Sequence, residues 1–121
     1  MKTLIVDDSM HSQLLLELYL KKLDFSSIVF KAQNGQEALD IINNQEEDFD
    51  LILIDIRMPV MSGYEFAKIY KGKAVVVATT GLNPYLFQDE IKLFHTVLIK
   101  PISFEVFKET VEKVISHKTL S

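Results

Sequence analysis

Short apolar runs alternate along the chain with segments in which apolar residues recur at helical spacing. Five runs predict β-strands, and most are continuous and apolar, as is typical of strands covered on both faces of a sheet. They lie at 3–6, 27–32, 51–54, 74–79 and 96–99. Because parallel neighbours need crossover connections, the alternation predicts an α/β fold, with an open, doubly wound parallel sheet and helices on both faces.

Five segments between and after these runs predict helices. The first begins near Ser9, and the others lie at about 36–44, 63–71, 84–94 and 103–115, the third being unusually short. Ser9 and Ser103 are suitable N-caps, and Pro84 suits a first helical position. We expect buried faces marked by Leu14, Leu15, Leu18 and Leu23 in the first helix, and by Phe104, Phe107, Val111 and Val114 in the last. The acidic segment 45–48 is expected to be a solvated loop.

The segment 82–94 holds more apolar side chains than one buried helix face requires. These are Leu82, Tyr85, Leu86, Phe87, Ile91, Leu93 and Phe94. Either some of them form an exposed patch for a partner or a second copy, or strand 96–99 and the last helix cover a wide helix face.

Composition limits the available chemistry and partners. With 121 residues and 48% hydrophobic content, we expect one domain with a sizeable core. The chain has no cysteine, and His11, His95 and His117 lack metal-ligand spacing, so we expect them to be ordinary surface or boundary residues. No signal peptide or membrane-spanning run is apparent, so we expect a soluble, cytoplasmic protein. The net charge is -4 and Arg57 is the single arginine, which disfavours nucleic acid as a partner.

Carboxylates stand where two of the expected strands end. Asp7 and Asp8 follow the first strand, and Asp55 follows the third. In a doubly wound sheet these two strands are neighbours at the switch point, where ligands bind beyond the carboxyl ends. Three converging acids would repel one another unless a cation joined them, and oxygen ligands alone suit Mg²⁺. Asp55 is then a candidate nucleophile that forms an aspartyl phosphate. Taken singly, such acids also cap helices or solvate strand ends.

Two further strand ends bring phosphate-binding groups to the same edge. Strand 74–79 ends in Thr79, and strand 96–99 is followed by Lys100 and Pro101. A hydroxyl donor and an ammonium group both bind phosphate oxygens, although Lys100 would otherwise extend into water. The sequence leaves open whether the Lys100–Pro101 bond is cis or trans.

Together these motifs resemble the receiver domain of bacterial response regulators, the phosphoacceptor part of two-component and phosphorelay signalling. The resemblance covers nearly the whole chain and rests on LIVDDS, LILIDIRMPVMSG, VVVATTG and VLIKP in that order. It implies a flavodoxin-like (βα)5 fold with five parallel strands in the order 2-1-3-4-5. It also implies one receiver domain over residues 1–121, with no output domain if the chain is a complete product rather than an excised part.

The resemblance implies roles for individual residues. Asp55 would be phosphorylated by a histidine kinase or phosphotransfer protein. The ligands of Mg²⁺ would be Asp7, Asp8, Asp55 and the main-chain carbonyl of Arg57. Thr79 and Lys100 would bind phosphoryl oxygens and relay the change to the face formed by the fourth helix, strand 96–99 and the last helix, where a downstream protein or a second copy would bind. Such a domain is not an enzyme acting on a separate substrate, since it catalyses only its own phosphorylation and dephosphorylation.

Several positions depart from the pattern of that family. Thr79 follows Asp55 by only 24 positions, which predicts a truncated third helix or a tight connection. Val97 stands where an aromatic residue is common, and Thr80 and Gly81 stand where alanine is frequent. We treat Thr80, Gly81 and Val97 as candidate modulators of the switch.

Three alternatives stay open. An unphosphorylated pseudo-receiver would use the same fold as an interaction module. A haloacid-dehalogenase-type phosphatase also has an aspartate nucleophile, but resembles a D-x-D motif on the first strand and needs a cap or extra length. A flavodoxin-type FMN binder would need a phosphate loop rich in serine, threonine and glycine, where this chain has Asp7, Asp8 and Ser9.

Overall fold

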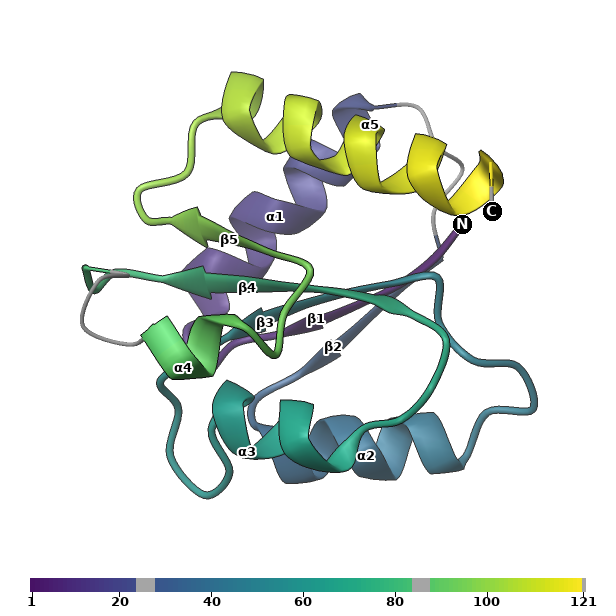
Figure 1. Cartoon of the computed structure of the whole chain (residues 1–121), viewed down its shortest axis with the longest axis vertical. Helices are drawn as coiled ribbons and strands as arrows, with labels where there is room; N and C mark the ends of the chain where they lie inside the picture. Colours follow the sequence, from purple (N-terminus) through teal and green to yellow (C-terminus); the bar gives the residue numbers. More distant parts are fainter. Residues whose placement is uncertain (24–27, 84–87, 121) are drawn as a thin grey trace.

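A parallel sheet of five strands runs through the centre of the protein in the order β2-β1-β3-β4-β5 (Figure 1). This computed structural model describes residues 1–23, 28–83 and 88–120, with side chains up to residue 116. The strands are β1 (Lys2–Val6), β2 (Ile28–Ala32), β3 (Leu51–Asp55), β4 (Val75–Thr80) and β5 (Thr96–Ile99). The doubly wound α/β fold and the strand order are therefore confirmed.

Helices cover both faces of the sheet, with α1 and α5 on one side and α2 and α3 on the other (Figure 1). The helices are α1 (Met10–Lys22), α2 (Gly35–Asn43), α3 (Gly63–Ile69), α4 (Gln88–Ile91) and α5 (Phe104–Leu120). The third helix is short, as predicted, and the last is longer than the predicted 103–115. The predicted start of the fourth helix at Pro84 lies outside the described residues.

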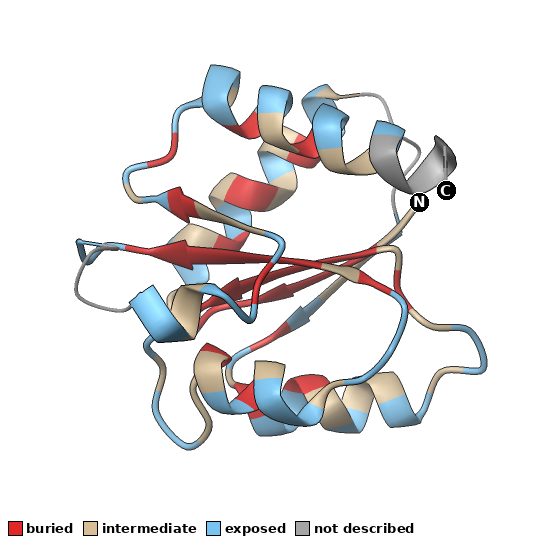
Figure 2. Cartoon of the chain, in the orientation of Figure 1, coloured by how far each residue is buried: buried red, intermediate tan, exposed pale blue. Residues whose placement is uncertain are grey.

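Alternate strand residues point to two separate apolar layers, as the two-residue repeat of a strand requires. Leu4, Ile52 and Ile54 pack toward α2 and α3, together with Phe49 and Phe66. The other layer, toward α1 and α5, contains Ile5, Leu51, Leu53, Leu16, Phe107 and Val111. Because helices cover both faces, the three central strands β1, β3 and β4 are buried almost throughout (Figure 2), which explains their continuous apolar runs, whereas most residues of the edge strands β2 and β5 are half-buried or exposed.

The prediction for the buried face of the first helix was wrong for Leu14 and Leu18, whereas Leu15 is half-buried and Leu23 packs against the core. Leu14 and Leu18 are 49% and 56% exposed, whereas Leu16 and Leu20 are buried. The leucine-rich sequence of this helix allows two overlapping stripes at helical spacing. The stripe that packs on the sheet contains a polar residue, Gln13, which binds backbone carbonyls beneath the helix.

The last helix follows its prediction. Phe107 and Val111 are fully buried, and the Ser103 hydroxyl accepts the Val106 N–H at 3.2 Å as an N-cap.

In the segment 82–94, Phe94 is buried while Leu82 and Leu93 are exposed, so part of that apolar surface faces solvent. Residues 84–87 of this segment lie outside the described residues.

A polar clamp closes the connection between α3 and β4. The Tyr70 hydroxyl is shared between both carboxylate oxygens of Asp48, at 2.9 and 2.8 Å, and accepts the Ala74 N–H at 3.0 Å. The Lys73 N–H also donates to Asp48, at 2.7 Å. A Cβ at Gly72 would collide with the Asp48 carboxylate and the Tyr70 hydroxyl, so this close approach requires glycine. The prediction of a solvated loop at 45–48 was therefore wrong for Asp48.

Burial, together with the nearby Asp48 carboxylate, raises the pKa of Tyr70 far above its ordinary value, so its hydroxyl remains a donor at any physiological pH. We expect Tyr70→Phe to lower the free energy of unfolding by about 1–3 kcal/mol, because the buried Ala74 N–H loses its acceptor and the half-buried Asp48 carboxylate loses one of its donors. Urea denaturation measures the loss. Tyr64→Phe, in α3, is the matched control and should leave stability unchanged; equal stability of the two variants would contradict a structural role for the clamp.

Candidate functional site

Four strand ends meet at one edge of the sheet and bring the predicted site residues together. Asp7 directly follows β1, and Asp55 ends β3, opposite Thr79 of β4 in the strand register. Carboxylate oxygens of Asp7, Asp8 and Asp55 all lie within 4.8 Å of one another. Asp7 is 1% exposed and Asp8 is exposed. The convergence expected from the strand ends is therefore confirmed.

Lys100 joins two of these carboxylates. Its Nζ lies 2.8 Å from Asp7 Oδ2 and 3.1 Å from Asp55 Oδ2, and 3.5 Å from the Ser12 hydroxyl. The Lys100–Pro101 peptide bond is cis. The alternative in which Lys100 extends into water is wrong, because its ammonium group lies in the acidic pocket.

Backbone N–H groups hold the remaining oxygens of the two buried acids. The Ser9 N–H donates to Asp7 Oδ1 at 2.9 Å, and the Arg57 N–H donates to Asp55 Oδ1 at 3.1 Å. Ser9 also caps α1 through its hydroxyl, as predicted. Within the described residues, the Asp8 carboxylate makes no hydrogen bond or ion pair. Asp7 and Asp55 are thus oriented by side-chain contacts, whereas Asp8 depends on its backbone.

Burial shapes the charges in this pocket. Burial raises the pKa of Asp55, and the negative charge of Asp7 adds to the rise, although the Lys100 ammonium and the Arg57 N–H oppose it. For Lys100, burial alone would lower the pKa, but its hydrogen bonds and charge attraction to Asp7 and Asp55 outweigh burial and raise it. Lys100 therefore stays charged, while ionisation of Asp55 is costly in this pocket.

Two adjacent threonines at the end of β4 differ in their hydroxyl partners. Thr79 and Thr80 are both buried. The Thr80 hydroxyl accepts the Leu82 N–H at 3.1 Å, whereas the Thr79 hydroxyl has no hydrogen-bond partner within the described residues. A buried hydroxyl without a partner is rare in folded proteins and calls for an explanation, such as a ligand bound at the site.

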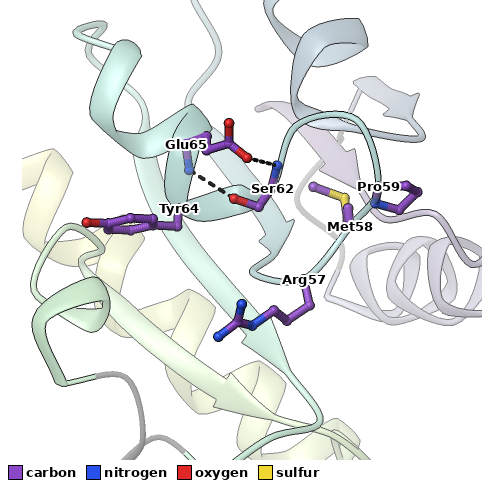
Figure 3. A pocket seen from close by; sticks show the side chains of 6 residues that line it. All are labelled: Arg57, Met58, Pro59, Ser62, Tyr64 and Glu65. Atoms are coloured by element: carbon purple, nitrogen blue, oxygen red, sulfur yellow. Dashed lines mark hydrogen bonds between the residues drawn. The ribbon is translucent and has the colours of Figure 1, made fainter.

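The loop after β3 forms an open pocket beside the acids, with a volume of about 600 Å³ (Figure 3). Its lining includes Arg57 and the capping box of α3, in which Ser62 and Glu65 exchange hydrogen bonds. A Cβ at Gly63 would collide with the Asp55 carbonyl, so α3 can begin this close to β3 only with glycine there. In the same loop the exposed Val60 has a φ of 69°, a conformation that strains a β-branched residue.

The three candidate modulators lie around the β4 end of the site. Thr80 fastens the loop after β4 through its bond to Leu82 and through its carbonyl, which accepts the Lys100 N–H at 2.7 Å. Gly81 faces open space, and the half-buried Val97 packs against the layer that contains Phe94. Their influence on a switch remains a prediction.

Sequence reasoning missed Gln13, whose side-chain amide donates to the backbone carbonyl of the site residue Asp7. Its only signal in the sequence is its spacing of three and seven positions from Leu16 and Leu20, two other buried residues of α1.

The histidine prediction agrees with the structure for two of the three residues. His11 is exposed, and His95 is exposed with its Nδ1 accepting the Val76 N–H at 3.1 Å. The His117 side chain lies outside the described residues.

The residues present fit a hard divalent cation. Three carboxylates converge, two of them buried, and when ionised they exceed the single ammonium group of Lys100 in charge. No sulfur or imidazole ligand belongs to this cluster, and oxygen ligands of this kind suit Mg²⁺.

The fold and this pocket define a class of signalling domain with an acidic site at the switch point of a doubly wound sheet. The chain belongs to the response regulator receiver domain family, whose family model matches residues 3–112. Members of this class are receivers that work with histidine kinases rather than enzymes with a separate substrate. Family membership removes the support for the phosphatase and FMN-binding alternatives.

Relatives of similar length cover nearly the whole chain. Sporulation initiation phosphotransferase F from Bacillus subtilis is 30% identical over 98% of this chain and 96% of its own. The probable chemotaxis protein CheY from Rhizobium etli is 32% identical over 93% of this chain and 91% of its own. By contrast, the chain spans only 14% of the sensor kinase/phosphatase LuxN from Vibrio campbellii and 50% of the transcriptional regulatory protein NatR from B. subtilis, each 30% identical.

Solved structures share both the fold and part of the sequence. Chemotaxis response regulator CheY4 of Vibrio cholerae is similar with a TM-score of 0.80 and 30% identity over 93% of this chain and 97% of that one. Response regulator TrrA from Thermotoga maritima, solved in complex with Mg²⁺ and BeF, has a TM-score of 0.79 and 30% identity over the same shares of 93% and 97%. Among the described residues, no helix has the length and apolar character needed to cross a membrane.

The raised pKa of Asp55 predicts that this acid destabilises the metal-free protein. Because its folded-state pKa lies above the unfolded value, its ionisation costs stability as pH rises through the folded-state pKa. We therefore expect Asp55→Asn to raise the free energy of unfolding at pH 7. The gain should shrink as pH falls below the ordinary pKa of 3.8, where the acid becomes protonated in both states.

Thermal unfolding of the two proteins across this pH range measures the effect. Asp8→Asn is the matched control, since it removes an exposed carboxylate from the same cluster and should give a smaller gain. A loss of stability in Asp55→Asn at pH 7 would show that the attraction to Lys100 dominates burial.

Proposed function

We propose that this protein is a phosphoacceptor of two-component or phosphorelay signalling and that Asp55 accepts the phosphoryl group. The observation that carries this proposal is the setting of the Asp55 carboxylate. It ends a buried strand with 12% of its side chain exposed, is paired with Lys100, and lies opposite Thr79, whose hydroxyl has no partner within the described residues. The Asp55 carboxylate, the Lys100 ammonium group and the Thr79 hydroxyl therefore lie in one pocket, as a phosphoryl acceptor and two phosphate-binding groups.

In this proposal the donor is the phosphohistidine of a histidine kinase or phosphotransfer protein. A carboxylate oxygen of Asp55 forms the new bond to phosphorus, the bond between phosphorus and the histidine nitrogen breaks, and the imidazole leaves with the electron pair. The TrrA structure, whose complex contains Mg²⁺ and BeF, supports a similar use of this site. In this proposal the chain acts in the cytoplasm, where it meets its phosphoryl donor.

The ligands proposed for Mg²⁺ are Asp7, Asp8, Asp55 and the main-chain carbonyl of Arg57. When bound, the ion neutralises negative charge between the carboxylates and the incoming phosphoryl group. Lys100, directly after β5, supplies a second positive charge and is held in place by Asp7 at 2.8 Å. Asp7 therefore both binds the ion and orients the lysine.

Phosphorylation would act on the protein through the two groups beside it. It adds about 1.5 to 2 negative charges and three acceptor oxygens next to Thr79 and Lys100. The Thr79 hydroxyl would then gain a partner, and Lys100 would divide its bonds between Asp7 and the phosphoryl group. Thr79 lies just before the loop that leads to α4, and Lys100 lies between β5 and α5; Leu82, Leu93, Ile99 and Val106, along these segments, are exposed. A downstream protein or a second copy would bind there, with residues 1–121 acting as one receiver domain.

Incubation with Mg²⁺ and acetyl phosphate tests the acceptor role. Intact-mass spectrometry should show the gain of one phosphoryl group in the wild type and none in Asp55→Asn. Asp40→Asn, an exposed position on α2, is the control and should be phosphorylated normally. If neither acetyl phosphate nor a phosphorylated kinase modifies the wild type, the pseudo-receiver alternative is correct.

The threonine pair tests the relay, because the two hydroxyls are adjacent and equally buried. Thr79→Val should keep the stability of the metal-free protein and accept the phosphoryl group, but beryllofluoride should no longer shift the NMR signals of Leu82 and Leu93. Thr80→Val should lower stability by about 0.5–1.5 kcal/mol through loss of the Leu82 hydrogen bond and retain those shifts. The reverse result would assign the relay to Thr80.

A further inference from the structure

Gln13 is a buried polar side chain in the first turns of α1. It is 8% exposed, and its Nε2 donates to the Asp7 carbonyl at 2.7 Å and to the Ala32 carbonyl at 3.0 Å. The two N–H donors of its amide thus match two carbonyl acceptors. Such a placement needs an explanation, since glutamine is seldom buried on the sheet-facing side of a helix.

The two carbonyls lie where the β1–β2 ladder ends. Ala32 is the last residue of β2, and its carbonyl also accepts the Asp7 N–H at 3.0 Å. Asp7 is the first residue beyond β1, so its own carbonyl has left the ladder. The Gln13 amide supplies the donor that the ladder no longer provides to this carbonyl. Without it, the buried carbonyl would be left unpaired, at a cost of about 1–3 kcal/mol.

The Asp7 carbonyl belongs to the peptide unit that joins Asp7 to Asp8. This unit is planar, so a hydrogen bond at its oxygen restricts the direction in which the chain continues to Asp8. The Asp7 side chain has further anchors in Ser9 and Lys100. The Asp8 carboxylate makes no hydrogen bond or ion pair within the described residues, so the backbone alone sets its place in the acidic cluster.

We propose that Gln13 is a positioning residue for the cation site: it holds the Asp7–Asp8 peptide and thereby aims the Asp8 carboxylate at the ion. This inference rests on the Mg²⁺ site of the proposed function. In this inference, α1 contributes to metal binding indirectly: Gln13 does not contact the ion but fixes the backbone that carries the Asp8 ligand. A purely structural Gln13 would affect stability alone.

Gln13→Met tests the inference, since methionine has a similar length and no donor. Calorimetric titration of the metal-free protein with Mg²⁺ should show about tenfold weaker binding, the effect typical of losing a group that orients a ligand. In the absence of Mg²⁺, the NMR signals of the Asp7 carbonyl carbon and the Asp8 amide nitrogen should shift. In an Asp8→Asn background, Gln13→Met should cost no further affinity, because the ligand it positions is gone.

Leu16→Val is the matched control on the same buried face of α1. It should lower stability while leaving Mg²⁺ affinity and the Asp7–Asp8 signals unchanged. If Gln13→Met does not fold, Gln13→Asn serves instead, because its shorter amide cannot reach both carbonyls and should give the same changes in smaller measure. Wild-type affinity in the Gln13 variant would overturn this inference alone, whereas a wild type that does not bind Mg²⁺ would overturn the metal site and the inference together.

Discussion

The ion pair of Lys100 with Asp7 and Asp55 is the interaction on which the site depends. It joins residues that are 45 and 93 positions apart in the sequence, at 3.1 and 2.8 Å. Only the parallel register can bring them together, because β1, β3 and β5 must end at the same edge of the sheet. The ammonium group offsets the repulsion between two buried acids, but burial still raises the pKa of Asp55. The ion pair therefore keeps the two acids side by side, but it does not fully offset the cost of burying their charges. A bound cation would offset more of that cost.

The two ends of the sheet differ in how their carboxylates and loops are held, although each end has one buried threonine hydroxyl, that of Thr3 or of Thr79, without a hydrogen-bond partner within the described residues. At the end away from the site, Asp48 accepts bonds from Tyr70 and Lys73, and Asp50 accepts the Lys2 N–H at 2.7 Å. At the site end, Thr79 has no hydroxyl partner within the described residues, and Val60 is strained. Strain and unpaired groups of this kind cost on the order of 1–3 kcal/mol each and persist only in a well-supported structure. The two apolar layers and the clamp at the opposite end supply that support.

The strands and the acids could be predicted because each depends on a local pattern. Continuous apolar runs mark strands buried on both faces, and an acid after such a run must lie at a strand end. The buried face of α1 could not be predicted in the same way, because leucines occupy both candidate stripes and hydrophobicity does not separate them. The contact that distinguishes the buried stripe is between Gln13 and the backbone carbonyls of Asp7 and Ala32, and a pattern of side-chain types does not predict such a contact. Asp48 escaped prediction for a similar reason: among neighbouring acids, nothing in the sequence marks the one that meets Tyr70.

The short third helix limits where a signal from Asp55 can travel. Gly63 packs directly against the Asp55 carbonyl, and its N–H donates to the Ile56 carbonyl at 3.0 Å, while the Ile56 N–H donates to the Thr79 carbonyl at 3.0 Å. The backbone beneath the acceptor is thus fixed from both sides. Beyond Thr79, Thr80 fastens the start of the loop after β4 through Leu82 and Lys100. Under the proposed function, new charge at Asp55 would therefore act through the side chains of Thr79 and Lys100 rather than through the backbone of β3.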